Sequence, residues 1–173
     1  PSIDLTVWAD YSLPPWPSKR FQDTLIIASS YSGNTEEPIT AFQEAIQRNL
    51  PVAVISTGGK LLDLAKKYLV PYIKIPDIGI QPRSSLGFTF KALAKIVGRE
   101  DLLREVSGLS SPLSSKMATL EQKGAKIAVM LKDKIPIIYS SALNKSIAPI
   151  WKIKFNETGK IPAFSNVFPE LNH

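Results

Sequence analysis

Short apolar runs alternate with amphipathic stretches along the chain, and this alternation predicts its fold. Residues 24–29 form a β-rich run of the kind that is buried on both faces of a sheet. The next apolar side chains recur at spacings of three and four, the pattern of a helix with one buried stripe: Ile39, Phe42, Ile46 and Leu50. A strand followed by an amphipathic helix is the first half of a parallel β–α–β unit.

The start of this helix carries polar signals. Asn34, with Glu37 three residues later, predicts an N-cap and a variant of the capping box. Pro38 is compatible with a first helical turn, because the first amides of a helix have no intrahelical partner. We therefore expect Asn34 to cap the helix that follows it.

The same pattern continues along the next fifty residues. Residues 51–56 and 72–75 have strand character, and residues 60–67 between them have helix character. A further helical stripe, closed by Gly98, lies at Leu86, Phe90, Leu93 and Val97. Residues 4–8 are expected to add one more strand. Strands and helices in this order predict a parallel sheet with helices on its faces.

The second half begins with a polar break that we expect over residues 107–112. Apolar side chains at spacings of four and three then predict one long core-facing helix: Leu113, Met117, Leu120, Gly124, Ile127 and Leu131. This stripe is too short to favour a dedicated coiled coil. Residues 135–139 have strand character, and a helix that ends near Gly159 is predicted from Ile147, Trp151 and Phe155.

These patterns divide the chain into three parts. We expect a first domain over residues 1–106, a connecting segment with the long helix over residues 107–132, and the start of a second α/β domain over residues 133–173. The chain begins at Pro1 and stops inside the second unit. We interpret it as a piece of a longer protein.

Composition excludes several kinds of chemistry. The chain has no cysteine, and its one histidine is the last residue, His173. Thiolate chemistry, a multi-histidine zinc site and a Ser-His-Asp triad with an internal histidine are therefore excluded within the chain. We expect no metal and no cofactor. The lack of cysteine also fits a reducing cytoplasm.

The charge balance is basic but dispersed. The chain has 21 basic and 15 acidic residues, a net charge of +6, and 44% hydrophobic residues, which is typical of a globular protein. The lysines lie at helix-surface spacing and are not interleaved with aromatic residues, so nucleic acid is not expected as a partner. Solvated helix faces explain most of this charge, and small anionic ligands are the alternative. No apolar run is long enough for a membrane span.

The segment Ser-Ser-Tyr-Ser-Gly-Asn-Thr, residues 29–35, is the first chemical signal. It follows a strand and precedes a helix, which is where an open parallel sheet binds ligands. Free amides and the positive end of the helix dipole favour an anion there. Three hydroxyls, from Ser30, Ser32 and Thr35, can complete a phosphate site, and Gly33 lets the backbone approach closely. A polar turn with a good cap is the alternative.

Residues 30–37, Ser-Tyr-Ser-Gly-Asn-Thr-Glu-Glu, resemble the phosphosugar loop of sugar isomerase (SIS) domains. This resemblance implies a flavodoxin-like, three-layer α/β sandwich around a five-stranded parallel sheet. Such domains occur in phosphosugar isomerases, in glucosamine-6-phosphate synthase and in bacterial regulators that sense phosphosugars. The loop by itself leaves these functions open.

Four further motifs follow the loop in order: residues 55–61, 81–87, 155–159 and 168–173. Together the five motifs resemble the bifunctional phosphoglucose/phosphomannose isomerases of archaea and bacteria. That resemblance implies two SIS domains in each subunit and a homodimer. It also implies metal-free interconversion of glucose 6-phosphate or mannose 6-phosphate with fructose 6-phosphate through a cis-enediol(ate).

The resemblance also implies roles for individual residues. Glu157 is the base that moves a proton between C1 and C2, and Arg83 stabilises the developing negative charge. His173 is the acid/base of ring opening, and in relatives this histidine can complete the site of the neighbouring subunit. The phosphate ligands are implied to be Ser30, Ser32 and Thr35.

Two family elements are expected outside the chain. A Gly-Gly-Ser loop would lie before Pro1, and a lysine-bearing segment would lie beyond His173. The alternative function is a non-catalytic phosphosugar-sensing module, which would need residues 30–35 but has no use for Glu157, Arg83 or His173. A nucleic-acid-binding regulator would need a helix-turn-helix, which the sequence does not contain.

Overall fold

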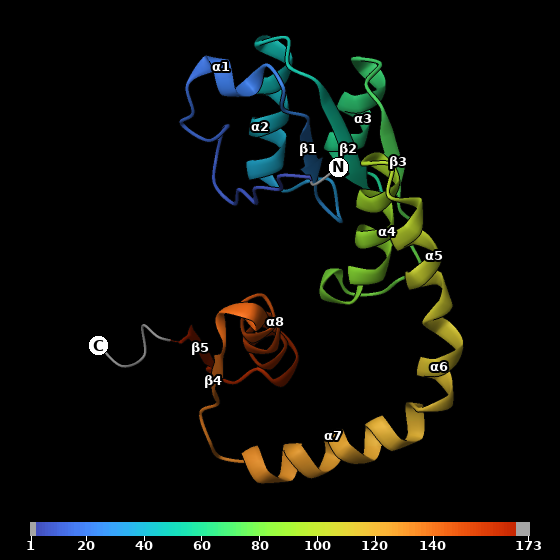
Figure 1. The fold of residues 1–173 in the computed structure, drawn as a ribbon, viewed down its shortest axis with the longest axis vertical. Helices are drawn as coiled ribbons and strands as arrows, with labels where there is room; N and C mark the ends of the chain where they lie inside the picture. The colour runs from blue at the N-terminus through green and yellow to red at the C-terminus, as the bar shows by residue number, and fades with distance from the viewer. Residues whose placement is uncertain (1–2, 169–173) are drawn as a thin grey trace. The chain divides into compact units, whose positions relative to one another are not determined.

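The computed structural model describes residues 3–168, and the chain divides into two compact units with a boundary between Ser107 and Gly108 (Figure 1). Each unit is described by itself. Both contain parallel strands with helices packed against them, which confirms the predicted α/β class.

The first unit is built on a three-stranded parallel sheet. Its strands are β1 (Ile26–Ser29), β2 (Val52–Ser56) and β3 (Tyr72–Lys74), in the order β1-β2-β3. All five residues of β2 are buried, whereas in β1 only Ala28 is. The burial expected on both faces of residues 24–29 is therefore wrong. In this sheet the strand buried throughout is β2. In the part of the chain that the structure describes, β2 has a neighbour on each side and β1 pairs only with β2.

Helices cover both faces of this sheet. On one face lie α2 (Glu36–Gln47) and α3 (Gly59–Lys67), whose side chains join Val54 of β2 in one core cluster. On the other face lies α4 (Leu86–Ile96), which contributes to a second cluster with Ile55. Adjacent residues of a strand point to opposite faces, so the unit has three layers.

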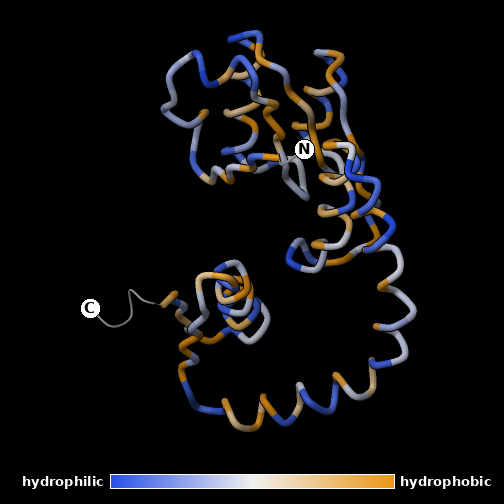
Figure 2. The backbone as a smooth tube through the Cα atoms, viewed as in Figure 1, coloured by the Kyte–Doolittle hydropathy of each residue, from blue (hydrophilic) through white to orange (hydrophobic). Residues whose placement is uncertain are grey.

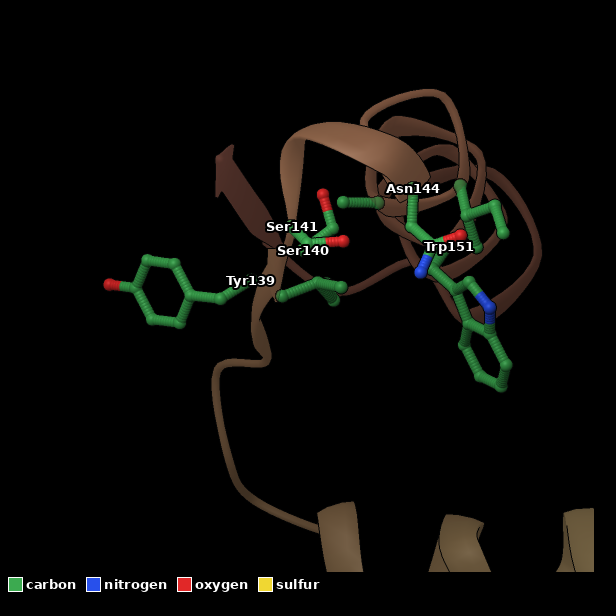
Figure 3. A pocket seen from close by; sticks show the side chains of 8 residues that line it. Tyr139, Ser140, Ser141, Asn144 and Trp151 are labelled. Carbon is green, nitrogen blue, oxygen red and sulfur yellow. The ribbon is translucent and has the colours of Figure 1, made fainter. Parts of the chain in front are cut away.

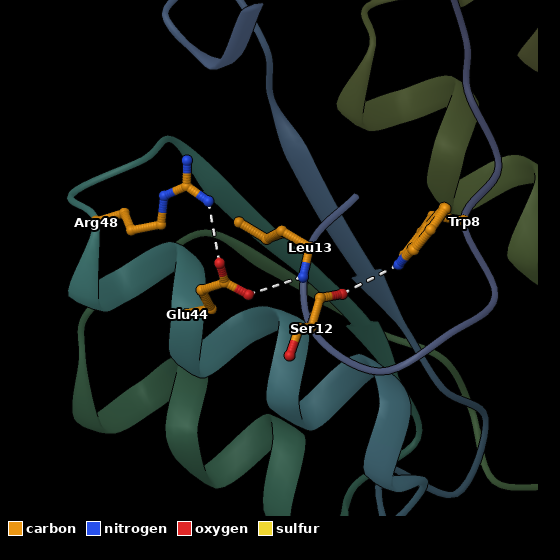
Figure 4. A network of polar contacts seen from close by, with 5 residues as sticks. All are labelled: Trp8, Ser12, Leu13, Glu44 and Arg48. Atoms are coloured by element: carbon orange, nitrogen blue, oxygen red, sulfur yellow. Dashed lines mark hydrogen bonds and ion pairs between the residues drawn. The ribbon is translucent and has the colours of Figure 1, made fainter. Parts of the chain in front are cut away.

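The predicted strand over residues 4–8 is wrong. The structure has no strand there, and its apolar side chains are exposed, with Val7 at 83%. Alternating apolar residues need a neighbouring strand, and the described residues supply none. Polar contacts hold the segment instead (Figure 4): the Trp8 indole donates to the Ser12 carbonyl (3.1 Å), and the Leu13 amide donates to Glu44 of α2 (2.8 Å). Arg48 pairs with the same carboxylate at 3.0 Å.

Short helical segments complete the first unit. A single turn, α1 (Ser18–Phe21), precedes β1, and the turn η1 (Pro82–Ser84) precedes α4. The last helix, α5 (Glu100–Gly108), reaches the unit boundary. Phe21 of α1 is buried and packs against Trp16, with ring centroids 5.5 Å apart.

The second unit begins with helices where the sequence predicted a break. Residues 107–112 are largely helical, because α5 ends at Gly108 and α6 (Ser110–Ser115) begins two residues later. Pro112 is tolerated because it lies in the first turn of α6, where a missing amide costs no intrahelical bond. The long helix, α7 (Met117–Leu131), therefore starts later than the apolar stripe.

No residue of α7 is buried, although its apolar positions were expected to face a core. Met117 is 57% exposed, and Figure 2 shows apolar and polar residues alternating along the helix. The period of the stripe was predicted correctly. Within the described part of the chain, no element covers it.

The remainder of the second unit is a small parallel β–α–β arrangement. Strand β4 (Ile137–Ser140) pairs with β5 (Phe164–Val167), and the helix α8 (Ile147–Lys154) packs on both. A short 3₁₀ turn, η2 (Ala142–Asn144), links β4 to α8, and a π-helical turn, η3 (Phe155–Gly159), extends α8. The strand and helix predicted for this region are present.

Phe42 tests the core of the first unit. It is completely buried between α2 and the sheet, so Phe42→Ala leaves a cavity and should lower the free energy of unfolding by ~3–5 kcal/mol. Leu69→Ala is the control: Leu69 is 90% exposed, and its truncation should change stability by less than about 0.5 kcal/mol. Urea denaturation followed by circular dichroism measures both. Equal effects of the two variants would contradict the packing described.

Candidate functional site

Two loops meet at the carboxyl edge of the first sheet. The first, residues 30–35, connects β1 to α2 and is called the serine loop below. The second, residues 57–59, leads from β2 into α3 and is called the glycine loop. Because β1 and β2 are parallel neighbours, both loops leave the same edge of the sheet, which is where such sheets bind ligands.

The three predicted hydroxyl residues lie together in the serine loop. Ser30 is buried, and its Oγ lies 2.8 Å from the Thr35 Oγ1 while accepting the Gly33 amide at 3.0 Å. The Ser32 hydroxyl accepts the Asn34 amide at 3.2 Å. The loop is therefore ordered by its own hydrogen bonds, with the exposed Ser32 and Thr35 on its surface.

The start of α2 differs from the expected cap. Thr35 is the N-cap residue, and its side chain makes no capping bond to the helix. The capping role expected of Asn34 is wrong, because its side-chain oxygen accepts the Lys60 amide of α3 at 3.1 Å. The first-turn amides of α2, those of Glu36 and Glu37, lack intrahelical acceptors. They are donors that an anion could use.

The glycine loop presses directly against the serine loop. Gly33 has φ +73°, and a Cβ there would lie 1.8 Å from the Gly58 carbonyl oxygen. Gly59 has φ +68°, and a Cβ there would lie 2.4 Å from the Ser32 carbonyl oxygen. Both positions therefore require glycine, for the positive φ and for the close approach.

Hydroxyl groups from the end of β2 reinforce this contact. The Thr57 Oγ1 donates to the Tyr31 carbonyl at 2.6 Å, and the Thr57 amide donates to the same oxygen at 3.0 Å. Ser56 is fully buried, and its hydroxyl donates to the Gly58 carbonyl at 2.8 Å. Ser56 was not singled out from the sequence. A serine at the buried end of a strand, just before Thr-Gly-Gly, was the available signal.

Negative charge surrounds the start of α2. Glu36 and Glu37 lie in its first turn, and the Tyr11 hydroxyl donates to Glu36 at 3.4 Å. The charges of Glu36 and then Glu37 raise the pKa of the Tyr11 phenol above its ordinary value. Carboxylates suit the positive end of a helix dipole, but they oppose a second anion. An anion at the serine loop would therefore meet the negative charges of Glu36 and Glu37.

Arg83 belongs to the same unit but to a different loop. It lies in η1, after β3, and is half-buried. The buried Ser85 hydroxyl donates to the Pro82 carbonyl at 2.7 Å and fixes this turn. Arg83 interacts with other residues of the chain.

Glu157 lies in the second unit, in the π-helical turn η3 that ends α8. Its side chain is exposed and interacts with other residues. The helix was predicted to end near Gly159, and the turn ends at Lys160, which has the left-handed conformation with φ 55°. A π-turn is an uncommon conformation that is frequent at functional sites. His173 lies outside the described residues.

The structure thus brings Ser30, Ser32 and Thr35 together. Arg83 lies on a separate turn of the first unit, and Glu157 belongs to the second unit. No group of three or more potential metal ligands occurs among residues 3–168. No helix in this described range is both long and apolar enough to cross a lipid bilayer.

The second unit has a hollow of about 400 Å³ beside the end of β4 (Figure 3). Its labelled lining includes Ser140, Ser141, Asn144 and Trp151. The Ser140 hydroxyl is buried without a partner in the described structure. None of the predicted site residues lines this hollow.

Comparison with known proteins identifies the class first. Residues 120–173 match the family model of the bacterial phosphoglucose isomerase C-terminal SIS domain. The crystal structure of a candidate phosphosugar isomerase from Clostridium difficile 630 has the same fold, with a TM-score of 0.61 and 15% identity. The similarity covers 91% of this chain and 50% of that one. The chain therefore shares the α/β fold of that structure, and its residues 120–173 are similar to a SIS domain.

Sequence comparison over nearly the full length of the chain then finds more specific similarities. It is 37% identical over 164 residues to a bifunctional phosphoglucose/phosphomannose isomerase of Aquifex aeolicus, over 95% of this chain and 49% of that protein. It is 39% identical over 166 residues to that of Thermoplasma acidophilum, over 95% and 50%. A D-glucosamine-6-phosphate 4-epimerase of Sulfolobus acidocaldarius is 32% identical over 152 residues, over 87% and 49%.

The resemblance inferred from the five motifs is confirmed. Along nearly its whole length the chain is similar to bifunctional phosphoglucose/phosphomannose isomerases. It spans about half the length of the curated relatives it matches.

Gly33 tests the contact between the two loops. Gly33→Ala places a Cβ against the Gly58 carbonyl and forces a positive φ on alanine, so the free energy of unfolding should fall by at least about 1–3 kcal/mol. Gly124→Ala is the matched control, because Gly124 lies within α7 with open space around it, and alanine there should stabilise by about 0.5–1 kcal/mol. Urea denaturation measures both variants. A Gly33→Ala protein as stable as the wild type would refute the close approach.

Proposed function

We propose that this chain carries the phosphate-binding part of an aldose–ketose isomerase. Its substrates are glucose 6-phosphate and mannose 6-phosphate, which it interconverts with fructose 6-phosphate through a cis-enediol(ate). The observation that carries the proposal is the serine loop: three hydroxyl residues at the free amino end of α2, in a chain whose relatives bear this activity in their names.

The phosphate is held by the serine loop. Ser32 and Thr35 donate hydroxyl hydrogen bonds, and Ser30 keeps Thr35 oriented through the 2.8 Å contact between their hydroxyls. The first-turn amides of α2 add donors. A phosphate bound here fixes one end of the sugar, so that the reacting carbons at the other end can be oriented for proton transfer.

The chemical step requires groups from elsewhere in the chain. Glu157 removes the proton from one of C1 and C2 and returns it to the other, Arg83 stabilises the negative charge of the enediolate, and His173 opens the ring. A carboxylate base and a fixed cation are the functions that this reaction requires. The proposal includes no metal and no cofactor.

The proposal extends to the whole protein. Residues 1–106 form most of a first SIS domain, residues 107–132 connect it, and residues 133–173 begin a second SIS domain. The match of residues 120–173 to a C-terminal SIS model supports a second SIS domain, and it begins within the connecting segment. The protein forms a homodimer and acts in the cytoplasm.

The hydroxyls of the serine loop can be tested directly. The double variant Ser32→Ala, Thr35→Ala removes two hydrogen bonds to a charged group, each worth about 1.5–3 kcal/mol, so hexose 6-phosphate should bind at least ~10-fold more weakly. Ser111→Ala, Thr119→Ala is the control, because both residues are exposed on helices of the second unit. Isothermal titration calorimetry measures the affinities. Unchanged affinity in the first variant would remove these hydroxyls from the phosphate site.

Glu157 separates an isomerase from a sensor. Glu157→Gln keeps the size of the side chain and removes its basicity, so kcat should fall at least ~100-fold while affinity for the sugar phosphate changes little. Exchange of the C2 proton with solvent should fall in parallel, because the same carboxylate carries that proton. Both are measured by coupled assay and by proton NMR in deuterated water.

Glu121→Gln, on an exposed position of α7, is the control and should retain the wild-type rate. A Glu157→Gln protein with near wild-type turnover would exclude this residue from the mechanism. A wild-type protein that binds hexose 6-phosphate without ever exchanging the C2 proton would favour the sensing module.

A further inference from the structure

Lys60 lies beside the serine loop without being part of it. It is the second residue of α3, and its amide donates to the Asn34 side-chain oxygen at 3.1 Å. The next amide, that of Leu61, donates to the Gly33 carbonyl at 2.9 Å. The first turn of α3 is thus attached to the serine loop by two hydrogen bonds.

The position of this lysine opposes the helix dipole. A cation in the first turn faces the positive end of the helix, which costs rather than contributes stability. The other lysines of α3, Lys66 and Lys67, lie in its last turn, where a cation is favoured. The first turn contains no acidic residue, and no ion pair among the described residues involves Lys60. A charge that breaks a local rule without a compensating contact often marks a functional position.

The serine loop lies beside an excess of negative charge. Its hydroxyls and amides carry no positive side-chain charge, and α2 adds the carboxylates of Glu36 and Glu37 in its first turn. A phosphate with nearly two negative charges would face both carboxylates. A nearby cation would offset this repulsion.

We propose that Lys60 is a phosphate-binding residue: its ammonium group completes the anion site that the serine loop and the start of α2 form. The inference deepens the proposed function and rests on it for the identity of the anion. The four-carbon stem of lysine is flexible, and at Lys60 it starts from the residue whose amide bonds the Asn34 side chain of the serine loop. The amino end of α2 then supplies free amides to the anion, and the first turn of α3 supplies the cation.

The role of Lys60 is tested by Lys60→Gln, with Lys66→Gln as the charge-matched control and Lys60→Arg as the conservative variant. Lys60→Gln should weaken binding of inorganic phosphate and of hexose 6-phosphate about tenfold, while the binding of unphosphorylated hexose stays the same. The difference from wild type should shrink as salt rises, because it is electrostatic. Lys66→Gln removes the same charge from the other end of α3 and should leave the affinity unchanged. Lys60→Arg should retain most of it.

Stability gives an independent readout. Lys60→Gln removes an unfavourable charge from the positive end of α3, so its urea midpoint should stay equal or rise while its affinity falls. Lys66→Gln removes a favourable charge, so its midpoint should stay equal or fall. A fall in affinity without a fall in the urea midpoint of Lys60→Gln distinguishes a ligand contact from a structural role.

Each outcome bears on one proposal. If Lys60→Gln binds phosphate as tightly as Lys66→Gln, the inference is overturned, whether or not Ser32→Ala, Thr35→Ala weakens binding. If phosphate affinity depends on Lys60 but the wild-type protein does not isomerise hexose 6-phosphates, the Lys60 site stands and the isomerase assignment fails. Loss of affinity together with a lowered midpoint in Lys60→Gln would also overturn the inference, since it would indicate damage to α3.

Discussion

The close approach of two backbones, at Gly33 and Gly58, is the constraint on which the candidate site depends. Parallel strands lie less than about 5 Å apart, so the loops that leave β1 and β2 at the same edge must pass each other with little space for side chains. Glycine at positions 33 and 59 leaves no Cβ to clash with the facing loop. The buried hydroxyl of Ser56 donates a hydrogen bond to the Gly58 carbonyl. The serine loop keeps its shape because the glycine loop supports it from the adjacent strand.

Local patterns predicted the parts of this arrangement that are local. The order of strands and helices followed from the periodicity, and the position of the serine loop followed from its place between β1 and α2. The direction of the Asn34 side chain could not be predicted this way. Its partner, the Lys60 amide, lies 26 residues away and becomes a neighbour only when the two strands pair. A capping signal read from three residues cannot include such a competitor.

The same limitation explains the errors in the fold. Residues 24–29 and 51–56 have similar apolar composition, yet only β2 is buried throughout, because burial depends on which strand lies in the middle of the sheet. Residues 4–8 alternate like a strand but have no partner in the described structure. The stripe of α7 has the correct period but nothing in the described range covers it. Periodicity reports what an element could bury, and pairing decides what it does bury.

Phosphate binding and chemistry are separable in a protein built this way. In the proposed function the serine loop holds a phosphate that does not react, and its binding energy would orient the carbons that do. This separation fits the relatives: proteins named as glucose and mannose phosphate isomerases and one named as a 4-epimerase of an amino sugar phosphate match this chain over similar lengths. The shared substrate feature in these names is a phosphorylated hexose, whereas the reacting carbons differ. If the proposed roles hold, a phosphate site supported by glycines on two loops can be retained while groups on other turns, such as Glu157 and Arg83, determine which carbon reacts.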